Sequence, residues 1–130
     1  ISSLFTATSD FYINWRQNEL YKDPLVAKVA SYFWDHLNEE ITLESVLKRF
    51  SVNKNTLNDA FNNELSMSCM AYLEYLRVSR AKKALQFGDE SVSEISQICG
   101  YDDTGYFSKV FKKHTGQTPS EYRKQMRIGL

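Results

Sequence analysis

A pattern of helix-capping and apolar residues occurs twice in this chain. In the first copy Thr42 precedes an apolar helical stripe that ends near Phe50, and in the second Ser91 precedes a stripe that ends near Cys99. The matching positions are 49 residues apart before a turn and 50 residues apart after it: Thr42 with Ser91, Leu43 with Val92, Val46 with Ile95, Phe50 with Cys99, Leu57 with Phe107, Phe61 with Phe111, Ser68 with Thr118, and Tyr72 with Tyr122. Because an internal repeat marks a repeated structural unit, the sequence predicts two copies of one helical unit. The alternative is a chance similarity between two amphipathic helix pairs.

Capping residues and helix-stopping glycines divide most of the chain into about seven helices. Pro24 and Pro119 both suit the first position of a helix, and Thr118 precedes the second of them as a cap. Gly88 and Gly116 follow the last apolar positions of two helical stripes. No alternation of apolar and polar residues with a period of two appears in the sequence, so we expect an all-α fold.

The two repeats flank the longest helical segment, which we predict over about residues 68–87. At 1.5 Å per residue this connecting helix is a rod of roughly 30 Å. Each repeat contains two short helices around a tight turn, so we predict helix-turn-helix subdomains over about residues 42–66 and 91–116. Together they form one domain over residues 23–130. The weakly periodic residues 1–22 are interpreted as a linker or the tail of a missing N-terminal domain.

The composition favours a folded domain that works in water. The chain has 130 residues, of which 42% are hydrophobic and 25% are charged, and this is enough to build a core. Its apolar runs are shorter than the ~18 residues that a membrane span needs, and its first residues lack the basic start of a signal peptide. We therefore expect a cytoplasmic protein without a membrane partner. Because the chain starts at Ile1 and not at Met, we expect a fragment of a longer protein.

The formal net charge is zero, but the charges are unevenly distributed along the chain. Residues 1–66 hold six Lys/Arg and nine Asp/Glu, whereas residues 67–130 hold ten and seven. From Thr104 to Leu130 there are six cations and one anion, Glu121. Local charge, not the total, determines how strongly a surface attracts a polyanion such as DNA. The C-terminal part is therefore the candidate nucleic-acid surface.

The second repeat and the segment before it carry a dense motif. Its residues are Leu76-Arg77-Val78-x-x-Ala81-x-x-Ala84-Leu85, Val92-x-x-Ile95-x-x-x-Cys99-Gly100-Tyr101, Tyr106-Phe107-Ser108-Lys109-x-Phe111-Lys112-Lys113-x-x-Gly116-x-Thr118-Pro119 and Tyr122-Arg123. With these residues the chain resembles, from about Pro24 to Met126, the DNA-binding domain of the AraC/XylS family of bacterial transcription regulators. The resemblance implies sequence-specific binding of double-stranded DNA and a separate sensing or dimerising domain. RNA polymerase is a further expected partner.

In a helix-turn-helix unit the second helix reads base edges in the major groove. We predict these reader helices over about residues 54–64 and 104–114. With the apolar residues turned inward, the positions available for base reading are Asn55, Asn58, Asp59, Thr104, Gly105, Ser108 and Lys109. The cations best placed for DNA phosphates are Lys54, Lys112, Lys113, Arg123 and Lys124. The family resemblance itself implies base contacts at positions 55, 59, 105 and 109.

Hydrogen-bond chemistry assigns a partner base to several of these residues. Lys109 can donate to guanine, Asn55 or Asn58 can pair with adenine, and ionised Asp59 can only accept, which fits the N4 amino group of cytosine. The alternatives are an ordinary solvated face for the lysines, surface filler for the asparagines and simple exposure for Asp59. Reader helices about 34 Å apart enter successive major grooves, so we expect one chain to bind two adjacent grooves.

The first reader helix departs from the family pattern. The family often has a basic residue where this chain has Asp59, Lys/Arg where it has Asn62-Asn63, and a Thr-Gly stop where it has Glu64-Leu65-Ser66. The helix has one cation, Lys54, and two anions, Asp59 and Glu64. Because carboxylates repel phosphates, we expect the second unit to supply most of the affinity. Gly105 lacks a side chain at a family reading position, which suggests close packing or a close backbone approach. The alternative function is a helical protein-interaction module that has lost specific DNA binding.

The remaining residues are expected to be structural, and we expect no enzyme, no metal and no cofactor. Tyr101, Tyr106 and Phe107 are expected to pack in the core or the turn, and His114 to lie at a helix end. Cys69 and Cys99 lie in apolar helical contexts without C-x-x-C spacing or a paired histidine, so buried free thiols are expected. An alkyl-transfer repair protein, which shares this type of helical domain, would need a reactive thiol with an activating partner.

Overall fold

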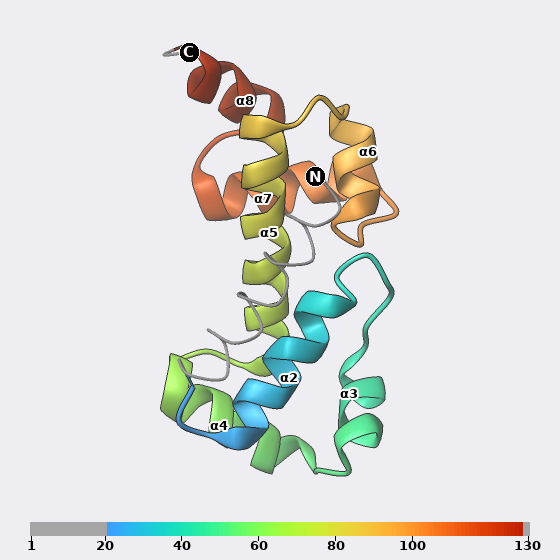
Figure 1. Cartoon of the computed structure of the whole chain (residues 1–130), viewed down its shortest axis with the longest axis vertical. Helices are drawn as coiled ribbons and strands as arrows, with labels where there is room; N and C mark the ends of the chain where they lie inside the picture. Colours follow the sequence, from blue (N-terminus) through green and yellow to red (C-terminus); the bar gives the residue numbers. More distant parts are fainter. Residues whose placement is uncertain (1–20, 129–130) are drawn as a thin grey trace, which may run out of the picture. The chain divides into compact units, whose positions relative to one another are not determined.

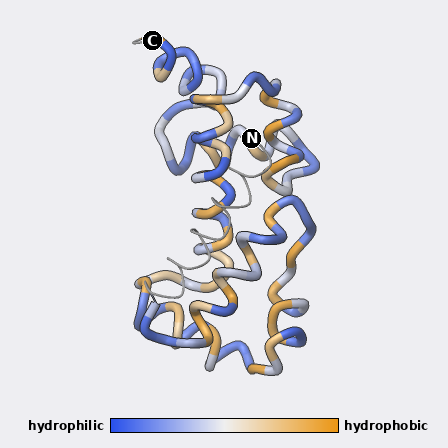
Figure 2. The backbone as a smooth tube through the Cα atoms, viewed as in Figure 1, coloured by the Kyte–Doolittle hydropathy of each residue, from blue (hydrophilic) through white to orange (hydrophobic). Residues whose placement is uncertain are grey.

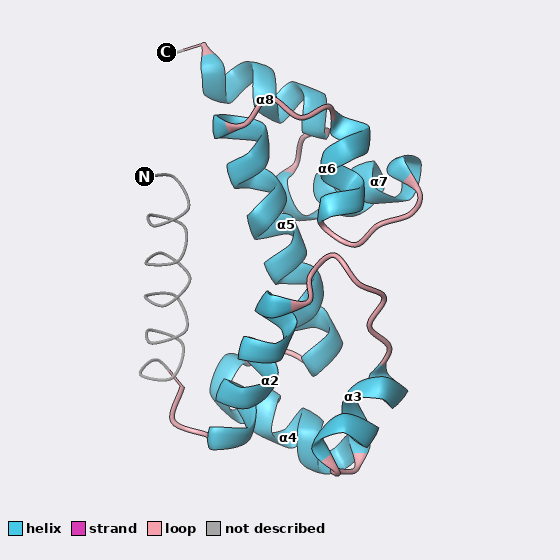
Figure 3. Ribbon diagram, turned by 45° about the vertical axis from the view of Figure 1, so that its right-hand side comes forward, coloured by secondary structure: helices cyan, strands magenta, loops and turns pink. Residues whose placement is uncertain are grey.

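The computed structural model describes residues 21–128 of the chain. These residues contain no strand (Figure 3), and the all-α prediction is confirmed. The predicted linker or domain tail over residues 1–22 lies, except for its last two residues, outside the described part. The helices are α2 (Pro24–Asp35), α3 (Leu43–Phe50), α4 (Lys54–Leu65), α5 (Cys69–Phe87), α6 (Val92–Ile98), α7 (Thr104–Thr115) and α8 (Pro119–Arg127) (Figure 1).

A residue with a capping side chain precedes each of five helices, which are α3, α4, α6, α7 and α8. Thr42 Oγ1 accepts a hydrogen bond from the Ser45 N–H at 3.1 Å and so caps α3. The equivalent bond from the Glu121 N–H to Thr118 Oγ1 is 3.2 Å and caps α8. Asp103, and not Asp102, caps α7. These bonds satisfy amides that have no acceptor within the first helical turn, so the helix starts follow directly from the sequence.

The described chain folds as two compact units. Unit 1 comprises residues 21–35 and 41–72, and unit 2 comprises residues 36–40 and 73–128. Unit 1 therefore contains α2, α3 and α4, and unit 2 contains α6, α7 and α8, while α5 begins in the first unit and continues in the second. Each unit holds one complete helix-turn-helix pair. No helix within the described residues combines the length and the apolarity needed to cross a membrane.

The core of unit 1 forms where α2 packs against the reader helix α4. α2 turns its apolar stripe inward, and Phe33 is fully buried. α4 contributes Leu57 and Phe61, which are also fully buried. The Phe61 ring lies 5.8 Å from the ring of Tyr72 in α5. The sequence places Leu37 on the same stripe, but α2 ends at Asp35, and the buried Leu37 belongs to unit 2.

The core of unit 2 is one cluster built around the buried face of α7. Phe107 and Phe111 are fully buried, and their ring centroids are 5.9 Å apart. Hydrophobic and hydrophilic residues follow one another along the helices (Figure 2). The buried members of the cluster are Val78, Ala81, Leu85, Ile95, Cys99, Tyr101, Phe107, Val110 and Phe111.

Candidate nucleic-acid interface

The turn between α6 and α7 sets the direction in which the second reader helix leaves the core. Gly100 has a φ of 89°, and a Cβ atom there would lie 2.3 Å from the carbonyl oxygen of Leu37. A side chain at this position is excluded both by the backbone conformation and by the close approach. Ser96 Oγ donates to the carbonyl oxygen of Tyr101 at 3.1 Å, and this bond is buried. The turn is therefore fixed by contacts inside unit 2.

Arg77 supports the same turn from α5. Its guanidinium Nη2 donates to the carbonyl oxygen of Glu39 at 2.9 Å, and its Cζ lies 5.5 Å from the centroid of the Tyr101 ring. A Cβ on Gly100 would also lie 3.0 Å from this guanidinium. Burial lowers the pKa of Arg77 from its ordinary value, but an arginine remains charged near neutral pH. Arg77 is thus a cation used inside the fold and not on the exposed face of α7.

The reader helix α7 presents cations on the face opposite its buried aromatic residues. Phe107, Val110 and Phe111 are buried. Lys109 and Lys112 are exposed, and neither takes part in an ion pair among the described residues. Gly105 is also exposed, whereas Thr104 and Ser108 are half-buried. The predicted reading positions of α7 therefore share its outer and flanking surface, with free ammonium groups among them.

Tyr106 lies on the exposed surface of α7. Its exposed fraction is 57%, while its ring keeps a tilted contact with Tyr101 at 6.0 Å. The expectation that Tyr101 and Phe107 are packed is confirmed, because both are buried. Tyr106 is therefore outside the core, and its contact with the Tyr101 ring agrees with the other expected place, packing against the turn.

Lys113 and His114 are tied to α5 through one carboxylate. Lys113 Nζ lies 3.3 Å from Glu74 Oε1, and His114 Nε2 lies 2.6 Å from the same oxygen. The Lys113 side chain is still 72% exposed, so it keeps access to water and to a phosphate. His114 lies near the C-terminal end of α7 as expected. The pair of contacts anchors that end of the helix to α5.

Arg123 occupies a different place from the one that its basic surroundings indicate. Its Nε donates to the carbonyl oxygen of Leu85 at 3.1 Å, and Nη2 donates to that of Ala84 at 3.5 Å. These carbonyls lie at the C-terminal end of α5, where backbone N–H donors from a following turn run out; the Ala84 oxygen also accepts the Gly88 N–H at 2.9 Å. The structure therefore favours a helix-capping role for Arg123 over the predicted phosphate contact. Lys124, its neighbour, is exposed.

The reader helix α4 of unit 1 is neutral to acidic on its outer face. Its N-terminal cap is Asn53, whose Oδ1 accepts the Thr56 N–H at 2.7 Å. With Leu57 and Phe61 buried, the helix presents a row of exposed polar residues. These exposed residues are Lys54, Asn55, Thr56, Asp59, Asn62 and Asn63.

Asn58 is set apart from that row. It is half-buried, and its Oδ1 accepts the Cys69 N–H at the start of α5 at 3.3 Å. A bidentate contact with adenine uses both the amide oxygen and the amide nitrogen of an asparagine. Because the oxygen is already engaged, the structure favours Asn55 over Asn58 as the adenine-reading candidate.

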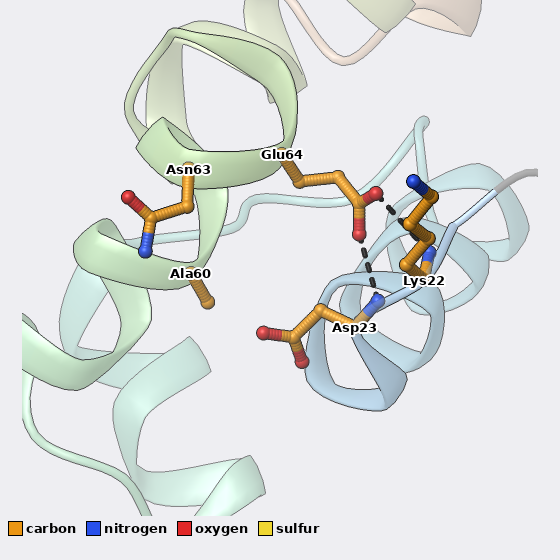
Figure 4. A pocket seen from close by; sticks show the side chains of 5 residues that line it. All are labelled: Lys22, Asp23, Ala60, Asn63 and Glu64. Atoms are coloured by element: carbon orange, nitrogen blue, oxygen red, sulfur yellow. Dashed lines mark hydrogen bonds between the residues drawn. The ribbon is translucent and has the colours of Figure 1, made fainter.

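The Glu64 carboxylate is hydrogen-bonded within its own unit. Its carboxylate accepts the backbone N–H groups of Lys22 at 3.1 Å and of Asp23 at 2.7 Å (Figure 4). These two hydrogen bonds lower the pKa of Glu64 from its ordinary value, and the bond from the Asp23 N–H has the larger effect. Together with Ala60 and Asn63 these residues line a small open cleft. Of the two anions in α4, Asp59 alone is left exposed on the outer face.

The two cysteines lack the features of catalytic thiols. Both are buried and neither forms a disulfide. Burial raises the pKa of Cys69 to about 12 and that of Cys99 to about 11. A thiol reacts as its thiolate, so these values disfavour alkyl-transfer chemistry. Within residues 21–128, no group of three His, Cys, Asp or Glu side chains is arranged to hold a metal ion.

An exposed second helix in each of two helix-turn-helix units defines the tandem helix-turn-helix class of DNA-binding fold. Residues 46–125 match the family model described as a helix-turn-helix domain. The chain belongs to the AraC/XylS family of helix-turn-helix domains.

Relatives and solved structures agree with this assignment. The xylose operon regulatory protein of Haemophilus influenzae is 36% identical over 101 residues, which are 78% of this chain and 26% of that protein. The C-terminal domain of AraT, a response regulator from Geobacillus stearothermophilus, superposes with a TM-score of 0.75 at 32% identity, over 79% of this chain and 86% of that domain. The DNA-binding domain of AdpA, solved in complex with a target DNA, gives a TM-score of 0.76 at 27% identity, over 83% of this chain and 96% of that one.

The match covers only part of the related regulators. The chain spans between 26% and 44% of the length of four curated relatives that it matches. The region that the chain shares with these relatives is therefore the helix-turn-helix domain, which contains the reader helices. The match does not extend over the remainder of those proteins.

Proposed function

We propose that this domain binds double-stranded DNA in a sequence-specific manner through its two reader helices and regulates bacterial transcription. The observation that carries the proposal is the outer face of α7, where Lys109 and Lys112 stand exposed above a fully buried aromatic face. A rigid helix that offers cations to solvent is suited to the negative potential of a major groove. The family membership of the chain supports the same function.

We propose that base reading by α7 depends chiefly on Lys109. Its flexible ammonium group can donate to O6 and N7 of guanine. Thr104 and Ser108 supply hydroxyl groups beside it, and Gly105 leaves room for the helix backbone to approach a base edge. Each good base contact discriminates by about 1–3 kcal/mol. The second half-site should therefore contain a guanine whose replacement costs more than that of its neighbours.

Base reading by α4 is assigned to Asn55 and Asp59. Both are exposed, and they are four residues apart on one face of the helix. Asn55 fits adenine, and Asp59 fits cytosine because a carboxylate can only accept. Asn58 is a weaker candidate because its oxygen holds the Cys69 N–H.

Phosphate contacts are assigned to the exposed lysines. Lys54 begins α4, Lys112 and Lys113 lie in the last turn of α7, and Lys124 lies in α8. Such contacts position the protein but carry no sequence information. Because one of the four lies in unit 1 and three lie in unit 2, unit 2 should supply the larger part of the affinity.

For the whole regulator we propose two adjacent half-sites and further partners. One chain carries both reader helices, so two successive major grooves can be read without a dimer, at half-sites about one helical turn apart. A sensing or dimerising domain and RNA polymerase are the proposed protein partners, and the bacterial cytoplasm is the proposed location. The relatives are longer than this chain, which leaves length for such a domain.

Selection of bound sequences from a random duplex library tests the proposed function. We expect two conserved blocks about 10–10.5 base pairs apart, with the stronger block contacted by unit 2. In parallel, the affinity for random duplex DNA should fall steeply with salt concentration. Failure to bind any duplex at low salt would contradict the proposal and favour a protein-interaction module.

A further inference from the structure

The chain segment that leads into α2 is held by the C-terminal part of the reader helix α4. The two oxygens of Glu64 are divided between two donors: Oε2 accepts the Lys22 N–H and Oε1 accepts the Asp23 N–H (Figure 4). Both donors are backbone groups, so the contact reports the position of the main chain and not of a flexible side chain. Residues 22 and 23 cannot move away from α4 without breaking these two hydrogen bonds.

A second contact holds the same segment through Tyr21. The Tyr21 hydroxyl forms a hydrogen bond with the Tyr72 hydroxyl, and the two rings meet edge to face with centroids 6.3 Å apart. Tyr72 is buried, and its ring in turn contacts Phe61 on the buried face of α4. The segment over residues 21–23 is thus connected to α4 through Glu64 directly and through Tyr72 indirectly.

The contacts of residues 21–23 with Glu64 and Tyr72 are called the clamp from here on. Asp23 links this clamp to α2, the helix that packs against α4. Its Oδ1 accepts the Leu25 N–H at 2.8 Å and so stabilises the first turn of α2. α2 packs against α4. One residue therefore joins the start of the supporting helix to the end of the reader helix, and a displacement of residues 21–23 would act on both.

We propose that Glu64 is a positioning residue for DNA reading, through which the orientation of α4 depends on the chain at residues 21–23. The inference rests on the proposed function of unit 1 as a DNA reader. Glu64 itself contacts neither base nor phosphate.

The decisive variant is Glu64→Gln in the 130-residue chain. Glutamine keeps the length of the side chain and one acceptor oxygen, but it places an amide donor where one of the two N–H groups needs an acceptor. The matched control is Glu44→Gln, which removes the same charge from an exposed position of unit 1. Both variants gain the same long-range attraction to DNA, so a difference between them isolates the clamp.

A further control separates positioning from simple destabilisation. Val46 is fully buried in unit 1 and lies outside the clamp. Val46→Ala lowers the stability of unit 1 by leaving a cavity. It reduces the fraction of folded unit 1, but the folded fraction keeps its base preference. The melting temperature of each variant is measured beside its selected sequences.

Selection from a random duplex library gives the readout. We expect Glu64→Gln to reduce base discrimination in the first half-site roughly tenfold, about the ratio carried by one base contact, and to leave the second half-site unchanged. Glu44→Gln and Val46→Ala should keep discrimination in both half-sites. Unchanged discrimination in Glu64→Gln, or an equal loss in Val46→Ala, overturns the positioning role.

The failure of the proposed function gives a different result. If the wild-type chain selects a single block of bases, then α4 reads no sequence and the role assigned to Glu64 falls with it. The surviving block would still support DNA binding by unit 2. The proposed function as a whole fails only when the wild-type chain selects no sequence and binds no duplex.

Discussion

Arg123 donates its Nε–H to the carbonyl oxygen of Leu85 at 3.1 Å, and so joins α8 to the last turn of α5. A charge-assisted bond of this kind contributes about 1–3 kcal/mol. The bond lies in the middle of the basic C-terminal stretch, where an arginine would otherwise be taken for a phosphate ligand. The position of this one side chain separates the structural cations of unit 2 from the cations available to DNA.

Replacement of Arg123 should therefore affect folding more than DNA binding. We expect Arg123→Ala to lower the free energy of unfolding by about 1–2 kcal/mol, because the α5 carbonyls lose a charged donor. The slope of the logarithm of DNA affinity against the logarithm of salt concentration should change by less than the release of one counterion would cause. Chemical denaturation and a salt titration measure the two effects. A stable variant with a clearly reduced salt slope would show that Arg123 binds a phosphate.

Lys109 and Lys112 should give opposite patterns in DNA binding. We expect Lys109→Ala to weaken binding and to relax the preference at one base pair, at a cost of about 1–3 kcal/mol for the preferred site. Lys112→Ala should weaken binding to all sequences alike and lower the salt slope by about one. Binding to the selected site and to a scrambled duplex at several salt concentrations separates them. Identical behaviour of the two variants would contradict the division into base and phosphate contacts.

Helix bounds and core residues could be predicted from the sequence because their causes are local. Asp103 and Thr118 cap helices through bonds within three residues, and the buried Phe107 and Phe111 follow the period of a single helix. Whether Tyr106 packs in the core or against the turn could not be decided from the sequence, because a residue at the border of the apolar stripe can face either way.

The contacts that changed the interpretation of the site join residues far apart in sequence. Arg123 bonds to a carbonyl 38 residues away, and Glu64 bonds to an amide 41 residues away. Nothing in their neighbouring residues indicates these partners, since the charge of each also suits a surface role. The reading positions Asn55, Asp59 and Lys109 stay predictions, because they depend on a DNA partner and not on contacts within the chain.

Gly105 and Gly100 should respond differently to alanine. A Cβ at Gly105 would meet only Asp103 Oδ1, at 3.2 Å, whereas one at Gly100 would lie 2.3 Å from the Leu37 carbonyl oxygen at a φ of 89°. Because Asp103 Oδ1 already accepts the Tyr106 N–H as the cap of α7, it has little freedom to move, and this crowding offsets the helix propensity of alanine. We therefore expect Gly105→Ala to change stability only slightly and Gly100→Ala to lower it clearly. Thermal denaturation compares them.

The same Gly105→Ala variant tests a close approach of the helix backbone to DNA. A Cβ at this position would meet only the capping atom Asp103 Oδ1, so packing against the core does not require a glycine there. We expect the variant to bind the selected site more weakly, by about tenfold for one disturbed base contact. Unchanged affinity in a titration of the selected duplex would remove Gly105 from the reading positions.

Glu64 should make the stability of the domain dependent on acid pH. Its two backbone hydrogen bonds lower its pKa below the ordinary value of 4.5 in the folded chain. A lowered carboxyl pKa contributes stability that is fully present above the unfolded pKa and is lost as the pH falls through the folded pKa. Glu64→Gln cannot make this contribution at any pH. We expect the wild type to melt at a higher temperature than the variant at pH 7, with the difference shrinking below about pH 4.5. Glu44→Gln is the control for general charge effects, and thermal melts of the three proteins from pH 7 to pH 3 measure the result. A difference that stays constant over this range would show that the carboxylate charge of Glu64 does not hold residues 22 and 23.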